Sequence, residues 1–330
     1  MSRRDDNYYD DRLQDIKLED ITSSQQNEDI LQQLQCGDPN LTKIHVDVIR
    51  EENESSSDDG ITFDANYEWD DLGFLGFFIG KSEHLKELSI FELPSHADSH
   101  TEQMDAFGRG ISRNRSIVDL SIEHNITDIG FRNMCSFFAE NNNLRKLQMH
   151  DFRHVHESVQ CFASMLEQRQ RNSLQRLSFD DNEFGDEDIE AIARALSRQA
   201  SLERFVLIEN DFGAPGCVAL GTTMSRWHAP NLTMLDLSNN IIDDAGVQAL
   251  VAGLINCNKL KSLLLSYNPI TAVGLRSLAA FFQSERCCLQ DFEMCGVYFG
   301  DDGAIALYSR WISGQYLVRY DLFPGELVWF

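Results

Sequence analysis

The sequence lacks the features that would place it in a membrane or a secretory pathway. Its longest nearly apolar run, Leu72 to Gly80, has nine residues, whereas about 20 are needed to span a bilayer. The first eleven residues contain no apolar core of the kind that a secretory signal requires. No C-x-x-C spacing occurs among the eight cysteines. We therefore expect a cytoplasmic protein with reduced thiols, with the nucleus as the alternative location.

Positive charge is also scarce. The 330 residues carry 28 Lys and Arg against 53 Asp and Glu, a net charge of −25. A field of this sign repels nucleic acid and anionic membrane surfaces, so neither is expected as a partner. A basic protein has the complementary charge and is the expected partner.

Motifs that carry chemistry are missing as well. The sequence contains no G-x-x-x-x-G-K-[ST], G-x-G-x-x-G, G-x-S-x-G or H-E-x-x-H. The run from His150 to His156 contains His and Asp residues that can bind a transition metal, although a polar turn between a strand and a helix explains it equally well. The pair His96 and His100 has the same two interpretations. We predict no enzymatic activity, no cofactor or metal, and no small-molecule substrate.

What the sequence does contain is a repeat. Clear copies start at Ile117, Leu174, Leu202, Leu232 and Leu260, and weaker copies start at Leu41, Leu85, Leu144, Leu289 and Leu317. The seven steps from Ile117 to Leu317 are 27, 30, 28, 30, 28, 29 and 28 residues. A fixed period in this range indicates a solenoid, in which each unit contacts its neighbours.

Each repeat has two halves. The first reads L-x-x-L-x-L-x-x-N, as in Leu232 to Asn240 (LTMLDLSNN), and predicts a strand whose fourth and sixth positions point inward while its third, fifth and seventh point outward. The Asn at position 9 can both donate and accept, so a stack of Asn side chains can satisfy backbone groups in a buried turn. The second half has apolar residues at helical spacing, as in Gly246 to Leu254, with Asp residues such as Asp243 placed to cap the helix.

These motifs resemble the leucine-rich repeats of the ribonuclease-inhibitor type. The resemblance rests on L-x-x-L-x-L-x-x-N, a following D-x-G helix start and the long period. It implies an α/β fold, a right-handed curved solenoid (horseshoe) with parallel strands on the concave face and helices on the convex face. It also implies that the protein binds other proteins. The Asn is replaced by Leu93, Phe152 and Val297 in three units, which interrupts the expected Asn ladder.

The repeat boundaries divide the chain into four parts. We expect a disordered acidic segment at 1–22, an atypical N-terminal capping repeat at 23–84, leucine-rich repeats of about 28–30 residues at 85–315, and a C-terminal strand and cap at 316–330. Inside the capping repeat, residues 50–68 are an insertion predicted to form an acidic surface loop. Its serines, Ser55 to Ser57, precede two Asp residues and suit an acidic-directed kinase, although a plain solvated loop explains them too.

The outward strand positions supply the candidate binding residues. Acids recur at positions 7 and 8, where neighbouring strands lie about 4.8 Å apart, so they are expected to form one stripe. Its members are Asp151, Asp180, Asp181 and Glu209. Lys146, Arg176 and Arg204 occupy position 3 and would make the opposite margin basic. The alternative for the stripe is that a chain with this net charge carries acids everywhere, and the alternative for the basic margin is charge balance that aids solubility.

An apolar group is expected beside the stripe. Its members are Val206, Ile208, Met234, Leu264 and Tyr267, on three adjacent repeats. An aromatic anchor with aliphatic neighbours and a charged rim is typical of a protein interface. The alternative is that the C-terminal tail or the acidic loop covers these residues within the same chain.

Three functions remain open from the sequence. The leading hypothesis is a non-enzymatic scaffold that binds a basic protein on its concave face. The second is a regulator of enzyme activity, either an inhibitor or a GTPase-activating protein of the kind found among similar repeat arrays. The third is the recognition part of a larger receptor or ubiquitin-ligase adaptor; no nucleotide-binding module or F-box-like helix set precedes the repeats, so we expect a chain that is complete without one.

Overall fold

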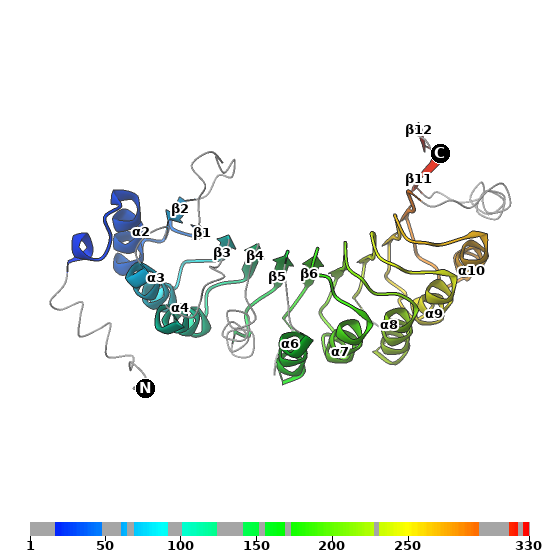
Figure 1. Ribbon diagram of the computed structural model, residues 1–330, viewed down its shortest axis with the longest axis horizontal. Helices are drawn as coiled ribbons and strands as arrows, with labels where there is room; N and C mark the ends of the chain where they lie inside the picture. The colour runs from blue at the N-terminus through cyan, green and yellow to red at the C-terminus, as the bar shows by residue number, and fades with distance from the viewer. Residues whose placement is uncertain are drawn as a thin grey trace. The chain divides into compact units, whose positions relative to one another are not determined.

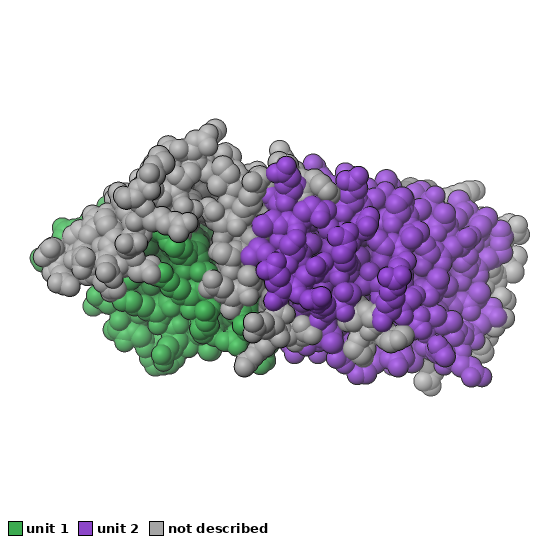
Figure 2. All heavy atoms as spheres, turned by 90° about the horizontal axis from the view of Figure 1, so that it is seen from below, with its two compact units in different colours: residues 1–146 green, residues 147–330 purple. Residues whose placement is uncertain are grey.

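The computed structural model describes most of the chain in two compact units. The described residues are 17–47, 61–64, 69–91, 101–123, 141–151, 156–168, 173–227, 231–296, 317–322 and 326–329. Unit 1 comprises residues 1–146 and unit 2 residues 147–330 (Figure 2). The histidine pair His96 and His100, most of the 150–156 run, Ser55 to Ser57 and the three Asn replacements lie outside the described residues.

Unit 1 alternates helices and strands. Its strands form a parallel arrangement in the order β4-β3-β1-β2. Its elements are the 3-10 helix η1 (Leu18–Asp20), α2 (Gln25–Cys36), β1 (Lys43–Asp47), β2 (Ile61–Asp64), α3 (Trp69–Lys81), β3 (Glu87–Phe91), α4 (Thr101–Arg113) and β4 (Asp119–Glu123).

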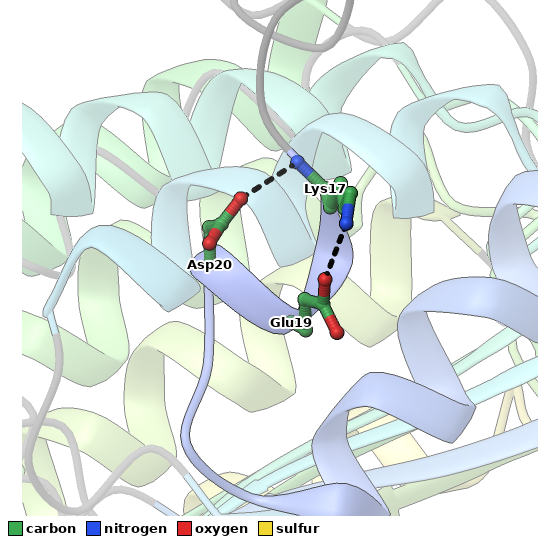
Figure 3. Close-up of polar contacts among 3 residues, drawn as sticks. All are labelled: Lys17, Glu19 and Asp20. Atoms are coloured by element: carbon green, nitrogen blue, oxygen red, sulfur yellow. Dashed lines mark hydrogen bonds and ion pairs between the residues drawn. The ribbon is translucent and has the colours of Figure 1, made fainter.

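The end of the segment predicted to be disordered is ordered. Ile21 and Thr22 are buried, and η1 precedes them. The Lys17 amide donates to Oδ2 of Asp20 at 3.2 Å and its ammonium donates to Glu19 Oε1 at 2.8 Å (Figure 3). Because Ile21 is part of the core, the turn that precedes it is ordered as well. The predicted end of the disordered segment, residue 22, therefore lies too far along the chain.

The acidic insertion also differs from the expectation of a loop. Residues 61–64 form β2, which pairs parallel with β1 and places Phe63 fully in the core. The alternation of Ile61 and Phe63 with polar residues is a strand pattern that the surrounding acids obscure.

Unit 2 repeats one strand and one helix. Its strands follow the order β12-β11-β10-β9-β8-β7-β6-β5, and its helices α6 to α10 lie side by side along one side of these strands (Figure 1). From the unit boundary onward the elements are β5 (Lys146–His150), α6 (His156–Gln168), β6 (Arg176–Asp180), α7 (Asp186–Leu196), β7 (Arg204–Val206), α8 (Ala214–Trp227), β8 (Met234–Asp236), α9 (Asp244–Leu254), β9 (Ser262–Leu264), α10 (Ala272–Phe282), β10 (Asp291–Glu293), β11 (Leu317–Leu322) and β12 (Glu326–Trp329).

The core of unit 2 lies between strands and helices. Positions 4 and 6 of each repeat point into it, as the L-x-x-L-x-L pattern predicts; Leu177, Phe179, Phe205 and Leu207 are all at most 1% exposed. The helices complete it with their apolar faces, for example Val247 and Leu250 of α9. The predicted α/β solenoid with parallel strands is confirmed.

The predicted Asn ladder is confirmed in four repeats. Nδ2 of Asn210 donates to the carbonyl of Phe179, in the preceding repeat, at 2.9 Å, and its Oδ1 accepts the Phe184 amide at 3.0 Å. Asn182, Asn240 and Asn268 donate in the same way to Met149, Leu207 and Leu237. Each Asn therefore links its own turn to the turn before it.

Helix starts are also linked across repeats. Oδ1 of Asp244, at the start of α9, accepts the amides of Thr271 and Gly274 in the next repeat, both at 2.8 Å. A Cβ at Gly274 would lie 2.6 Å from that oxygen, so this glycine, which is equivalent to Gly246 of the preceding repeat, makes room for the neighbouring carboxylate. Asp243 caps its own helix instead, accepting the Gly246 amide at 2.9 Å.

A second set of buried amides was not predicted. It lies three residues before a repeat start, where a helix turns back toward the next strand. Asn114 and Asn141 in unit 1 and Gln199 in unit 2 are fully buried there. Gln199, for example, donates to the Leu166 carbonyl of the preceding repeat at 3.0 Å. The repeat that starts at Leu174 thus has hydrogen-bonded amides at both of its turns, Asn182 at one and Gln199 at the other.

The C-terminal strands form a hairpin. β11 continues the parallel order beside β10, and β12 folds back on β11 in the antiparallel sense. A strand and cap were predicted at 316–330, and both β11 and β12 lie in this segment. No helix in the described ranges is long and apolar enough to cross a membrane.

Candidate partner-binding face

The strand face of unit 2 is defined by its register. Because the strands are parallel and aligned, equivalent positions of successive repeats form rows. At position 3 the row is Arg176, Arg204, Met234, Ser262 and Asp291; at position 5 it is Ser178, Val206, Asp236, Leu264 and Glu293. All eight predicted contact residues from Asp180 to Tyr267, and Asp151 with them, lie in unit 2.

Position 8 was predicted to lie in a strand, and it does not. Strands β7 to β10 end at position 5, and position 8 has left-handed backbone in six successive repeats. The residues concerned, with φ between 50° and 68°, are Asp151, Asp181, Glu209, Asn239, Tyr267 and Gly296. The amide of each of the first five donates to the position 7 carbonyl of the next repeat, at 2.7 to 3.1 Å. The side chains at positions 7 and 8 therefore both point outward. In a continuous strand, the side chain at position 8 would have pointed into the core.

The acids of the predicted stripe form two groups by environment. Asp181 and Glu209 are exposed at position 8, and Glu209 accepts a hydrogen bond from Asn239 at 3.1 Å. Asp180 is half-buried at position 7, where the Ser178 hydroxyl donates to its carboxylate at 3.0 Å. Burial raises the pKa of Asp180 most; Ser178 and His150 lower it, and Glu209 raises it further. The structure thus brings Asp180 within the field of Glu209.

The apolar group is interrupted by a carboxylate. Val206 and Leu264 are half-buried at position 5, and the residue between them in register is Asp236, only 5% exposed. The Ser238 amide donates to Asp236 Oδ1 at 3.1 Å. Burial is the main cause of the raised pKa of Asp236; the hydrogen bonds from Ser238 lower it, and Glu293 and Asp180 raise it. Asp236 and Glu293 were missed because only positions 3, 7 and 8 were searched for charges.

Tyr267 is the most prominent apolar side chain of the predicted group. It is 54% exposed, whereas Val206, Ile208, Met234 and Leu264 are half-buried. Its ring lies against Gly296, where a Cβ would come within 2.2 Å of Tyr267 Cδ1. A further exposed side chain that sequence reasoning missed is Ile241, 57% exposed, in the turn after β8.

The opposite margin of this face is basic in two repeats, whereas the same row continues with Met234, Ser262 and Asp291. Arg176 and Arg204 are exposed and adjacent in register at position 3. In unit 1, Lys146 forms an ion pair with Asp119 at 3.0 Å.

Among the described residues, no three His, Cys, Asp or Glu side chains are placed to hold a metal ion. The seven described cysteines are free thiols. Cys217 is buried, whereas Cys161 is partly exposed. Burial raises the pKa of Cys257 to about 12, which keeps it in the thiol form.

A family model described as "Leucine Rich repeat" matches residues 171–193, 228–251 and 256–279. Each of these segments combines a strand of unit 2 with part of an adjacent helix. The chain is built from leucine-rich repeats of the ribonuclease-inhibitor type. The pig ribonuclease inhibitor is 30% identical over 181 residues, covering 54% of this chain and 38% of that protein.

Other relatives of this leucine-rich repeat chain are larger proteins. The bovine "NACHT, LRR and PYD domains-containing protein 3" is 26% identical over 232 residues, covering 60% of this chain and 22% of that protein. "RAN GTPase-activating protein 2" of Arabidopsis thaliana is 28% identical over 102 residues, covering 31% and 18%. The chain thus spans less than two fifths of each of these three relatives.

Proposed function

We propose that this protein is a non-enzymatic interaction scaffold, in the cytoplasm or the nucleus, that binds a basic protein on the strand face of unit 2. The observation that carries the proposal is the combination on one face of an exposed aromatic anchor, Tyr267, with half-buried aliphatic side chains and carboxylates. The net charge of −25 favours a cationic partner. Leucine-rich repeat relatives with binding functions, such as the ribonuclease inhibitor, support an interaction role.

The anchors can be tested by affinity capture. The double variant Ile208→Asp/Tyr267→Ala should lose about 2 kcal/mol or more of binding free energy, because an interface anchor of this type contributes that much when it is truncated. Wild-type protein and variant are used to capture partners from native lysate at low and high salt, with mass spectrometry as the readout. We expect a basic protein that is captured by the wild type alone and less strongly at high salt.

The matched control is Val218→Asp. Val218 is 52% exposed on α8, on the helix side of unit 2, so this change also places a charge at an exposed apolar position. It should leave capture unchanged. Equal capture by all three proteins would contradict the assignment of Ile208 and Tyr267 as anchors.

The acidic stripe can be tested through association rates. With the captured partner, Asp181→Lys/Glu209→Lys should slow association by about tenfold at low salt, because both exposed charges steer a cationic surface. The difference should vanish near 1 M salt, where the Debye length is about 3 Å. Stopped-flow or biosensor kinetics measure this directly.

A double variant with one change on α7 and one in the turn after α10 separates steering from net charge. Glu190 and Glu285 are exposed, and Glu190→Lys/Glu285→Lys changes the net charge equally. It should slow association much less. If both double variants slow association by the same factor, the stripe has no special role and only the net charge of the protein matters.

A regulator of enzyme activity is the second candidate, because the relatives include an inhibitor of an enzyme and a GTPase-activating protein. Adding the protein to a small GTPase loaded with GTP tests the activating version. Faster hydrolysis would support it, and an unchanged rate would remove it for the GTPase tested.

A further inference from the structure

The carboxylate of Asp236 lies in an apolar setting that the scaffold function alone does not explain. Val206 and Leu264 flank it in register, each about one strand spacing away, and Met234 lies on the same side of the same strand. All three apolar side chains are partly exposed, whereas Asp236 is only 5% exposed. The arrangement is an acid at the base of an apolar surface.

The charges around Asp236 do not neutralise it. Its electrostatic neighbours among the described residues are Glu293 and Asp180, both carboxylates. Glu293 lies in the same register row, two strands further along. Burying a charge without a counter-charge is costly, and nearby charges of the same sign add to that cost. A cation bound to Asp236 would reduce both the cost of burying its charge and the repulsion from the neighbouring carboxylates.

The hydrogen bonds of Asp236 limit which cation fits. Ser238 already supplies two donors, its amide to Oδ1 at 3.1 Å and its hydroxyl. A guanidinium binds a carboxylate best through two parallel bonds along a free edge, whereas an ammonium is a compact point charge that needs one oxygen. A lysine also has an alkyl stem that can lie on apolar surface while its charge contacts the acid.

We propose that Asp236, with Val206 and Leu264 on either side, is a binding site for one lysine side chain of the protein partner. The alkyl stem lies between the two aliphatic side chains and the ammonium pairs with Asp236, while Glu293 and Asp180 strengthen the local negative field. This site deepens the proposed scaffold function and rests on it for its biological role. Its chemistry can be measured without the partner.

The test uses Nα-acetyl-lysine methylamide as the probe and the 13C-labelled methyl groups of Val206 and Leu264 as reporters. We expect saturable shifts at these methyls with a dissociation constant on the order of 10 mM, as befits a single side chain. The methyls of Val218 and Ile241 should not shift. Nα-acetyl-norleucine methylamide, which has no charge, should bind at least about fivefold more weakly, as should Nα-acetyl-arginine methylamide.

The variant Asp236→Asn removes the charge and keeps an oxygen that can accept from Ser238. It should abolish the preference for lysine over norleucine. The fold should be retained, because the raised pKa means that the folded protein favours the neutral form of Asp236. The contribution of Asp236 to stability is thus greatest below its ordinary pKa of 3.8 and falls as the pH rises toward the folded value. At neutral pH the urea midpoint of Asp236→Asn should equal or exceed that of the wild type.

Three results would overturn the site: no shift at Val206 and Leu264 with the lysine probe, equal shifts with norleucine, or undiminished lysine binding by Asp236→Asn. Equal or tighter binding of the arginine probe would overturn the assignment of lysine. The capture experiment stands apart from these titrations. A failed probe titration with successful capture removes the lysine site alone, and the reverse removes the scaffold function while the site remains.

Discussion

Asn268→Ala should destabilise the protein by about 3 kcal/mol, because several buried backbone groups lose their partner at once. Asn268 is 4% exposed. Its Nδ2 donates to the carbonyls of Leu237, Leu265 and Ser266 at 2.9 to 3.3 Å, and its Oδ1 accepts the Ile242 amide at 3.0 Å. Alanine fills none of these roles. The free energy of unfolding in urea measures the loss.

The control is Asn258→Ala, ten residues earlier. Asn258 is exposed in the turn after α9. Its replacement should change the free energy of unfolding by less than about 0.5 kcal/mol. If Asn268→Ala were as mild as this control, the cross-repeat hydrogen bonds would not be what stabilises the turns.

Gly253→Ala is the second change with a large expected effect. Alanine is the better helix former by about 1 kcal/mol, so a purely local view predicts stabilisation. A Cβ at Gly253 of α9, however, would lie 2.4 Å from the Gly221 carbonyl oxygen and 2.6 Å from the Gly221 Cα of α8. Both are backbone atoms, which can yield only if one helix moves. We expect a net loss of about 2 kcal/mol, as is typical of overpacking.

The control for this variant lies on the same helix. Gln248 is exposed on α9, and Gln248→Ala should be neutral or slightly stabilising in the same urea experiment. A Gly253→Ala protein at least as stable as the wild type would show that α8 and α9 can separate at little cost.

The repeat determined most of what the sequence could predict. The inward direction of Leu235 and Leu237, the helix from Gly246 and the amide role of Asn240 all follow from residue type and spacing. These are local properties, and the same sequence pattern recurs in the next repeat. The second turn was harder to predict. Asn114, Asn141 and Gln199 share their place three residues before a repeat start, but the residue type there is not constant and is Cys257 before Leu260.

The binding face was harder to predict because it depends on where each strand ends. Tyr267 was predicted to point outward as part of a strand, although strict strand alternation would have turned it into the core. It points outward because its backbone is left-handed. Asp236 could have been found by reading position 5 across repeats, as Val206, Asp236 and Leu264 are consecutive there. The near-complete burial of Asp236 could not have been predicted from the sequence, because burial depends on the side chains of three strands together.

The left-handed column at position 8 separates the chemistry of the surface from the construction of the turn. The turn is held by main-chain amides, from Asp151 to Tyr267, and by the neighbouring Asn side chains. None of these bonds uses the side chain at position 8. An acid, an amide or a phenol can therefore be exchanged there for a small conformational penalty, lowest for Asn and Gly. Each repeat therefore presents one surface side chain at position 8 that can be substituted independently. Binding specificity can change at these positions while the fold stays the same.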